Sequence, residues 1–90
     1  MKKLIRAATA TPNPETQKII DYIESEGLVF QSIDWANDFT SFTGKRFQAW
    51  CVNWILGEIE FEFGENIPGV NYNALKQYLR KQLQGYGGGW

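Results

Sequence analysis

Six residues near the middle of the chain alternate strictly between glutamate and a large apolar side chain. They occupy residues 58–63, with the sequence EIEFEF, and follow Gly57. Successive side chains of a β-strand point to opposite faces, so this order would separate the carboxylates from the apolar groups. The pattern predicts a short strand whose Glu58, Glu60 and Glu62 face solvent or a cationic partner.

The same segment has a helical alternative. Cys51, Ile55, Ile59 and Phe63 are four residues apart, so a preceding helix could continue through it. Gly57 argues against this, because a glycine inside a helix costs about 1 kcal/mol relative to alanine. We therefore favour the strand. Its expected partner is a strand over residues 2–9, and a third strand could come from residues 28–33.

Four helices are expected around this β element. Apolar residues at helical spacing predict them over about residues 14–26, 32–39, 45–56 and 71–84. Asn13 can cap the first helix, and Gly27 can end it in the left-handed conformation. The third helix is the most apolar. The predicted core consists of Ile19, Ile23, Phe47, Trp50, Trp54, Ile55, Leu75 and Leu79.

These elements predict a helix-dominant α+β domain over residues 1–84, with an all-α bundle as the alternative. Residues 85–90 (GYGGGW) have too few side chains to order themselves and predict a flexible tail. Tyr86 and Trp90 on this tail are either docking groups or a free end.

Charge is distributed unevenly along a chain whose net charge is only −1. Residues 1–20 carry a net +3, residues 21–65 a net −7 and residues 66–90 a net +3. The basic ends could fold onto the acidic middle. Alternatively, an acidic surface would attract a basic partner and raise its association rate.

The main functional hypothesis follows from the second explanation of the uneven charge, an acidic surface that attracts a basic partner. It is a non-enzymatic inhibitor or adaptor whose acidic surface binds a basic protein partner that handles nucleic acid. Carboxylates spaced along a strand can mimic phosphates and compete for Arg and Lys. The expected partner-binding residues are Glu58, Glu60, Glu62 and Glu65, extended by Asp34 and Asp38.

Most catalytic chemistry lacks its residues in this chain. Histidine is absent and Cys51 is the only cysteine, which excludes the common zinc sites and Ser–His or Cys–His nucleophiles. Cys51 lies among apolar residues and is predicted to be in the core. We expect no cofactor and no metal. A carboxylate-based hydrolase using the glutamates would need a pocket that nothing in the sequence indicates.

The setting is expected to be the cytoplasm. A single cysteine fits a reducing compartment, and no stretch of the sequence approaches the length of a membrane span.

Residues 32–55 offer an alternative function as a helix-turn-helix DNA-binding regulator. Thr43 and Gly44 would form the turn, and Lys45, Arg46 and Gln48 would contact DNA. A sequence pI of about 5.3 works against phosphate neutralisation, so direct nucleic-acid binding is the less favoured hypothesis.

In length, acidity, its MKKLIRA opening over residues 1–7 and its lack of catalytic residues, the chain resembles small accessory proteins of phages and mobile elements. These include anti-CRISPR inhibitors. The resemblance implies a compact, non-enzymatic protein that blocks a CRISPR effector or a similar nucleic-acid-binding complex in the host cytoplasm. It transfers no site residues, because no family motif is matched.

Overall fold

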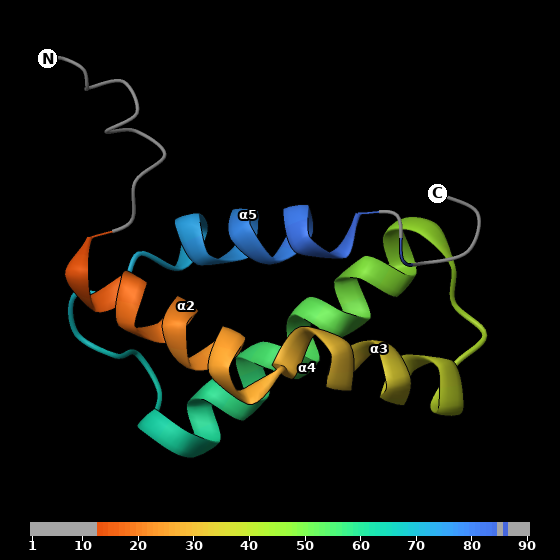
Figure 1. Ribbon diagram of the computed structural model, residues 1–90, viewed down its shortest axis with the longest axis horizontal. Helices are drawn as coiled ribbons and strands as arrows, with labels where there is room; N and C mark the ends of the chain where they lie inside the picture. The colour runs from red at the N-terminus through yellow and green to blue at the C-terminus, as the bar shows by residue number, and fades with distance from the viewer. Residues whose placement is uncertain (1–12, 85, 87–90) are drawn as a thin grey trace, which may run out of the picture.

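The computed structural model describes residues 13–84 and residue 86 of the chain. Four α-helices follow one another (Figure 1): α2 (Pro14–Glu26), α3 (Leu28–Phe39), α4 (Gly44–Phe63) and α5 (Tyr72–Leu83). Within the described residues there is no strand. The helix-dominant part of the prediction is confirmed, and the described residues fit the all-α alternative rather than the α+β fold.

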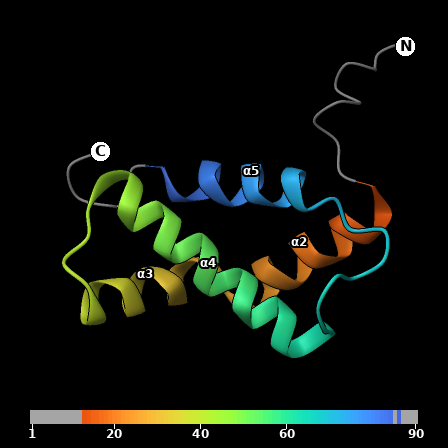
Figure 2. The same ribbon diagram turned by 180° about the vertical axis from the view of Figure 1, so that it is seen from behind.

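The longest helix, α4, runs diagonally across the molecule and organises the others. Both α4 and α2 pack against α3 and α5. Figure 2 shows α4 from the opposite side, crossing in front of α3, with α5 lying along one edge. No described helix is long and apolar enough to cross a lipid bilayer.

The first helix, α2, begins and ends where local signals predict. The Asn13 carboxamide oxygen accepts a hydrogen bond from the Thr16 N–H at 2.8 Å, which satisfies a free donor of the first turn. Gly27 ends the helix with φ of 65°, a conformation that glycine adopts without steric cost. These predictions are confirmed.

The same residues attach α2 to the loop before α5. The Asn13 amide donates to the Gly69 carbonyl at 2.7 Å, and the Asn71 N–H donates to the Thr16 hydroxyl at 2.7 Å. Asn71 also caps α5, since its side chain accepts from the Ala74 N–H at 3.0 Å. The last helix, α5, therefore begins within one residue of its predicted start.

The second helix starts earlier than expected. It begins at Leu28, directly after Gly27, so the predicted strand over residues 28–33 is wrong. Leu28, Ser32 and Ala36 are four residues apart and are all buried. This spacing places them on the side of the helix that faces the core.

The predicted strand over residues 58–63 is also wrong, because these residues form the last turns of α4. Ile59 lies one helical turn after Ile55, and both are buried. Burying an isoleucine contributes about 1.5–3 kcal/mol, which exceeds the cost of about 1 kcal/mol for Gly57 in the helix. The expected strand partner, residues 2–9, lies outside the described residues.

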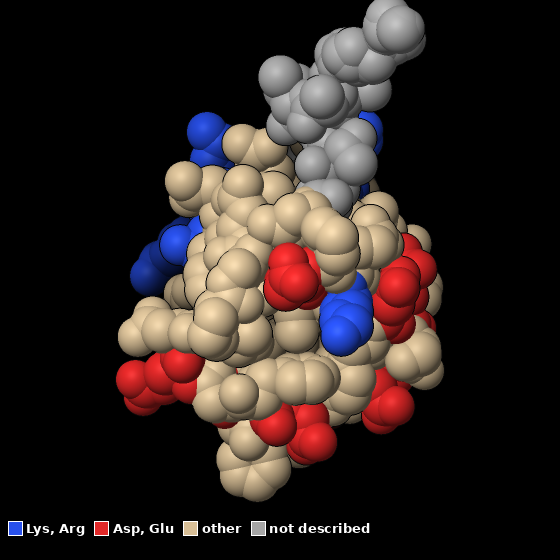
Figure 3. All heavy atoms as spheres, turned by 90° about the vertical axis from the view of Figure 1, so that its left-hand side faces the viewer, with Lys and Arg blue, Asp and Glu red and all other residues tan. Residues whose placement is uncertain are grey.

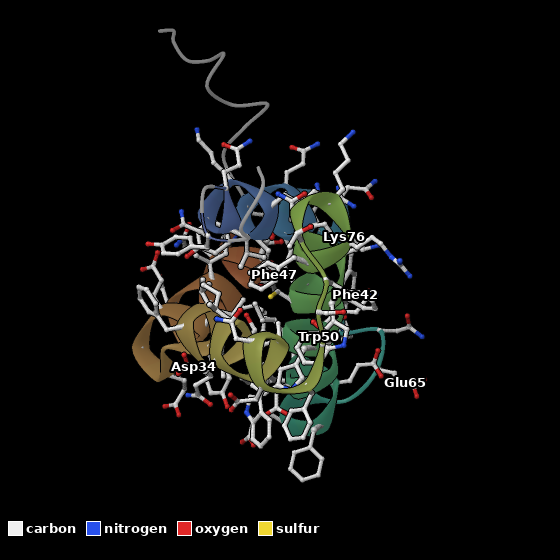
Figure 4. The ribbon with its side chains drawn as sticks, turned by 90° about the vertical axis from the view of Figure 1, so that its right-hand side faces the viewer. Asp34, Phe42, Phe47, Trp50, Glu65 and Lys76 are labelled. Carbon is white, nitrogen blue, oxygen red and sulfur yellow. The ribbon has the colours of Figure 1, made fainter. Side chains whose placement is uncertain are left out.

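The core prediction is confirmed except at its edge. Trp50 and Trp54 are only partly buried and pack against the core from outside it. In Figure 4, Phe47 lies between the helices and Trp50 at the border with α3. The buried apolar side chains are Ile19, Ile20, Ile23, Leu28, Ala36, Phe47, Cys51, Val52, Ile55, Ile59, Leu75, Leu79 and Leu83.

Candidate functional site

The three central glutamates do not share a face. Glu58 and Glu62 are one helical turn apart on α4, so they lie on the same side of the helix. Glu60 is rotated by about 200° from Glu58, which places it on the other side. The acidic face predicted from strand geometry is therefore wrong in this respect.

Glu58 and Glu62 lie on the side of α4 that faces the end of α2. Partial burial raises the pKa of Tyr22, and the carboxylates of Glu62, Glu26 and Glu58 raise it further. A neutral phenol is favoured where negative charges converge. Carboxylates from two helices therefore lie close enough to act on this tyrosine.

Aromatic side chains accompany these carboxylates. The rings of Tyr22 and Phe63 meet edge to face, with their centroids 4.9 Å apart. Phe61 is 87% exposed and lies three residues after Glu58, so the two are neighbours on the helix surface. We call this set the acidic–aromatic surface; it consists of Tyr22, Glu26, Glu58, Glu62 and Phe63, with Phe61 at its border, since Phe61 is rotated by about 200° from Phe63 around α4.

This end of the molecule carries mainly negative charge. Figure 3 faces the side on which α4 ends and α2 begins. Acidic side chains spread over its middle and lower part, with a small basic patch among them, and the other basic groups lie toward the left and upper edges. The three-dimensional structure therefore keeps much of the charge separation that the sequence shows.

Glu60 and Glu65 belong to a different environment. Together with Lys76 of α5 they line a shallow cavity of about 230 Å³. A lysine beside two carboxylates reduces the negative potential there. For these two residues, the structure favours the interpretation in which basic segments fold onto the acidic middle.

Asp34 and Asp38 lie on α3, away from the acidic–aromatic surface. Asp34 and Glu65 are on opposite sides of the molecule in Figure 4. Each aspartate precedes an exposed aromatic residue, and these two rings, Trp35 and Phe39, stack with centroids 5.0 Å apart. The six predicted partner-binding residues are thus divided among three places.

Of the residues predicted to contact DNA, two already make contacts within the protein. Gln48 donates a hydrogen bond to the Arg80 carbonyl of α5 at 3.0 Å, so its side chain holds two helices together. The Arg46 guanidinium lies 4.5 Å from the centre of the Phe42 ring, a cation–π contact. Lys45 is exposed.

The Gln48 bond also shows a basic cluster that the sequence analysis missed. It places the beginning of α4 beside the last turn of α5, where Arg80 and Lys81 lie. Lys45 and Arg46 begin α4, so the basic residues of the two helix ends lie at the same end of the molecule. In the sequence, only Arg80 and Lys81 at the end of the last helix indicated this cluster.

The charges on α4 oppose its dipole at both ends. Its first turn carries Lys45 and Arg46 and no acid, and its last turn carries Glu60 and Glu62 and no base. A helix dipole favours the reverse arrangement, by about 0.3–1 kcal/mol per charge. These charges therefore lower the stability of α4.

Of the predicted tail, the structure describes only Tyr86. The Tyr86 N–H donates to the Leu83 carbonyl at 3.2 Å, and its ring meets the Phe30 ring edge to face at 6.1 Å. Tyr86 thus folds back onto α3. Trp90 lies outside the described residues.

The described residues include no group of three or more Cys, Asp or Glu side chains placed to hold a metal ion. Cys51 is fully buried, as predicted, and its thiol donates to the Ser32 carbonyl at 3.6 Å. Burial raises the pKa of the Cys51 thiol, so the residue stays protonated and unreactive near neutral pH.

No protein-family model, curated protein or solved structure matches this chain.

Proposed function

We propose that this chain is a non-enzymatic binding protein, and that its acidic–aromatic surface engages a basic surface on a protein partner. The observation that supports this most is that Glu26, Glu58 and Glu62 lie close enough to act on Tyr22, with the exposed Phe61 at the border of the surface. An aromatic anchor surrounded by charges is a common arrangement of protein-binding surfaces.

The energetics of α4 support the same proposal. Glu62 lies at the negative end of the helix dipole, one turn from the like charge of Glu58. Both interactions are unfavourable in the free protein. Lysine or arginine side chains of a partner would relieve them, so part of the binding free energy is already stored in the surface.

Proteins that handle nucleic acid are the partner class with the most suitable surface. Their channels present Lys and Arg to phosphate groups, and clustered carboxylates can compete for the same cations. An inhibitor that occupies such a channel in the cytoplasm of a host cell, as anti-CRISPR proteins do, is the biological role that we propose.

The test begins with capture of partners from the native host and identification by mass spectrometry. Binding of the purified partner is then measured by calorimetry at several salt concentrations. We expect the double variant Glu58→Gln/Glu62→Gln to bind about 2- to 30-fold more weakly, because each exposed ion pair contributes about 0.2–1 kcal/mol.

Glu60→Gln/Glu65→Gln is the matched control, since it removes the same two charges from the cavity beside Lys76, outside the acidic–aromatic surface. It should leave affinity nearly unchanged. Equal effects of both variants, or an affinity that does not depend on salt, would exclude this surface as the binding site. Nucleic acid should also compete with the protein for the partner.

The basic cluster supports a second candidate function, the binding of nucleic acid. Lys45, Arg46, Arg80 and Lys81 lie at the same end of the molecule, although Gln48 is already engaged. This candidate predicts duplex binding that weakens steeply with salt. The absence of duplex binding at low ionic strength would exclude it.

A further inference from the structure

A second cavity lies where three helices meet. It has a volume of about 260 Å³ and is formed by the end of α2, the beginning of α3 and the outer part of α5, together with Tyr86. None of its residues belongs to the acidic–aromatic surface. The cavity therefore supports an inference that does not depend on the proposed function.

Three aromatic rings from three segments line this cavity. They belong to Phe30 of α3, Tyr78 of α5 and Tyr86 after α5. The Phe30 and Tyr86 rings stand at 90° to each other, with centroids 6.1 Å apart. Rings in this arrangement form two walls of a corner.

One carboxylate lies among the rings. The Tyr78 hydroxyl donates to Oε2 of Glu24 at 2.8 Å, which fixes the carboxylate at the wall of the cavity. A carboxylate can accept about four hydrogen bonds or ionic contacts, so this one retains capacity for a ligand. Burial raises the pKa of Tyr78, and the hydrogen bond and negative charge of Glu24 raise it further, followed by the charge of Asp21.

The rest of the lining is apolar or uncharged. Val29 contributes aliphatic surface, Ile23 lies fully buried behind the lining, and Gln82 is the remaining polar side chain. None of the lining residues is lysine or arginine. The cavity thus combines aromatic faces, one negative charge and aliphatic surface, and its own lining supplies no positive charge.

We propose that this cavity is a binding site for an alkylated ammonium group. The negative faces of aromatic rings attract cations, and ammonium groups whose hydrogens are replaced by methyl groups lose little hydration when they enter an aromatic corner. Glu24 supplies the opposing charge, while Val29 contacts the methyl groups. The group could belong to a small molecule such as choline or to a methylated lysine side chain of a protein.

The test is an NMR titration of the whole chain with choline and with its neutral carbon analogue 3,3-dimethylbutan-1-ol. The two have nearly the same shape and differ in charge. We expect choline to shift the signals of Phe30, Tyr78 and Tyr86 in a saturable manner, and the neutral analogue to bind at least several-fold more weakly. Equal binding of the two probes, or no saturable shift with either, would overturn the proposal.

A second pair of probes identifies the source of the group. Nα-acetyl-trimethyllysine methylamide and its unmethylated counterpart are titrated in the same way. Tighter binding of the trimethylated lysine than of choline would assign the site to protein side chains, and the reverse order would assign it to a small molecule. Preference for the unmethylated lysine would overturn the proposal.

Substitutions of lining residues test whether choline binds in this cavity. Phe30→Leu and Tyr86→Leu each remove one ring at a position that is 62% and 49% exposed, respectively, so the fold should be retained. Each should weaken choline binding about 2- to 5-fold, and Glu24→Gln should weaken it by a similar factor. Phe39→Leu, which removes an exposed ring outside the cavity, is the matched control. An equal loss in the control would place binding elsewhere and refute the assignment.

Discussion

Replacing Glu62 with glutamine should make the protein more stable. The negative charge of Glu62 lies in the last turn of α4, which carries no base, and there it costs about 0.3–1 kcal/mol at low salt. Glu58 lies one turn away, and repulsion at that spacing costs about 0.2–0.5 kcal/mol more. The free energy of unfolding should therefore rise by about 0.5–1.5 kcal/mol.

Glu15→Gln is the matched control, for which the free energy of unfolding should change in the opposite direction. Glu15 lies in the first turn of α2, where the helix dipole favours a negative charge. Removing that charge should lower the free energy of unfolding by about 0.3–1 kcal/mol. The two variants make the same chemical change, so a general effect of replacing glutamate would move both in one direction.

Urea denaturation at low and high ionic strength measures both effects. In a domain of this size, 1 kcal/mol also shifts the melting temperature by about 4–8 °C. Both changes should shrink at about 1 M salt, where the screening length is about 3 Å. Glu62→Gln should in addition lower the pKa of Tyr22, which can be followed by NMR, because the Glu62 carboxylate contributes to raising it.

A destabilised Glu62→Gln variant, or shifts of the same sign in both variants, would refute this account of α4. A gain in stability that persists unchanged at high salt would mean that the effect is not electrostatic.

Three further predictions concern the fold. Gly57→Ala should raise the free energy of unfolding by about 0.8–1 kcal/mol, because an added Cβ would meet no atom within 4 Å; a loss of stability in urea denaturation would contradict the helical continuation. Thr16→Val should lower the free energy of unfolding by about 1–3 kcal/mol, because the Asn71 N–H loses its acceptor. Thr16→Ser keeps the hydroxyl and should have a much smaller effect. Stability should fall as pH rises above about 8.5, because an unfolded chain releases the Cys51 and Tyr78 protons at lower pH than the folded one, in which burial raises both pKa values. In alkaline denaturation Tyr78→Phe should show a shallower fall, and an identical slope would remove Tyr78 from the explanation.

Local signals in the sequence predicted the elements that depend on local chemistry. The cap at Asn13, the left-handed Gly27 and the apolar stripe of α2 each act within a few residues, so they could be recognised without the rest of the fold. The burial of Cys51 could be predicted for the same reason, because its neighbours at helical spacing are apolar.

The candidate site was less predictable. The glutamates of residues 58–63 were recognised, but their direction depends on whether the segment is a strand or a helix. Tyr22 and Glu26 come from another helix about 35 residues earlier, and nothing local in the sequence places them beside Glu58. The Phe30, Tyr78 and Tyr86 cavity likewise joins segments that are far apart in sequence.

By itself, the sequence determined which side chains could form a helix, where α2 is capped, and that the charge is divided between an acidic middle and basic ends. Only the tertiary structure decided the conformation of residues 58–63. An alternating pattern fits a strand only if another strand pairs with it, whereas a helix satisfies its own backbone hydrogen bonds. Here Ile59 gains a buried position by following Ile55 around α4, and that gain exceeds the cost of Gly57.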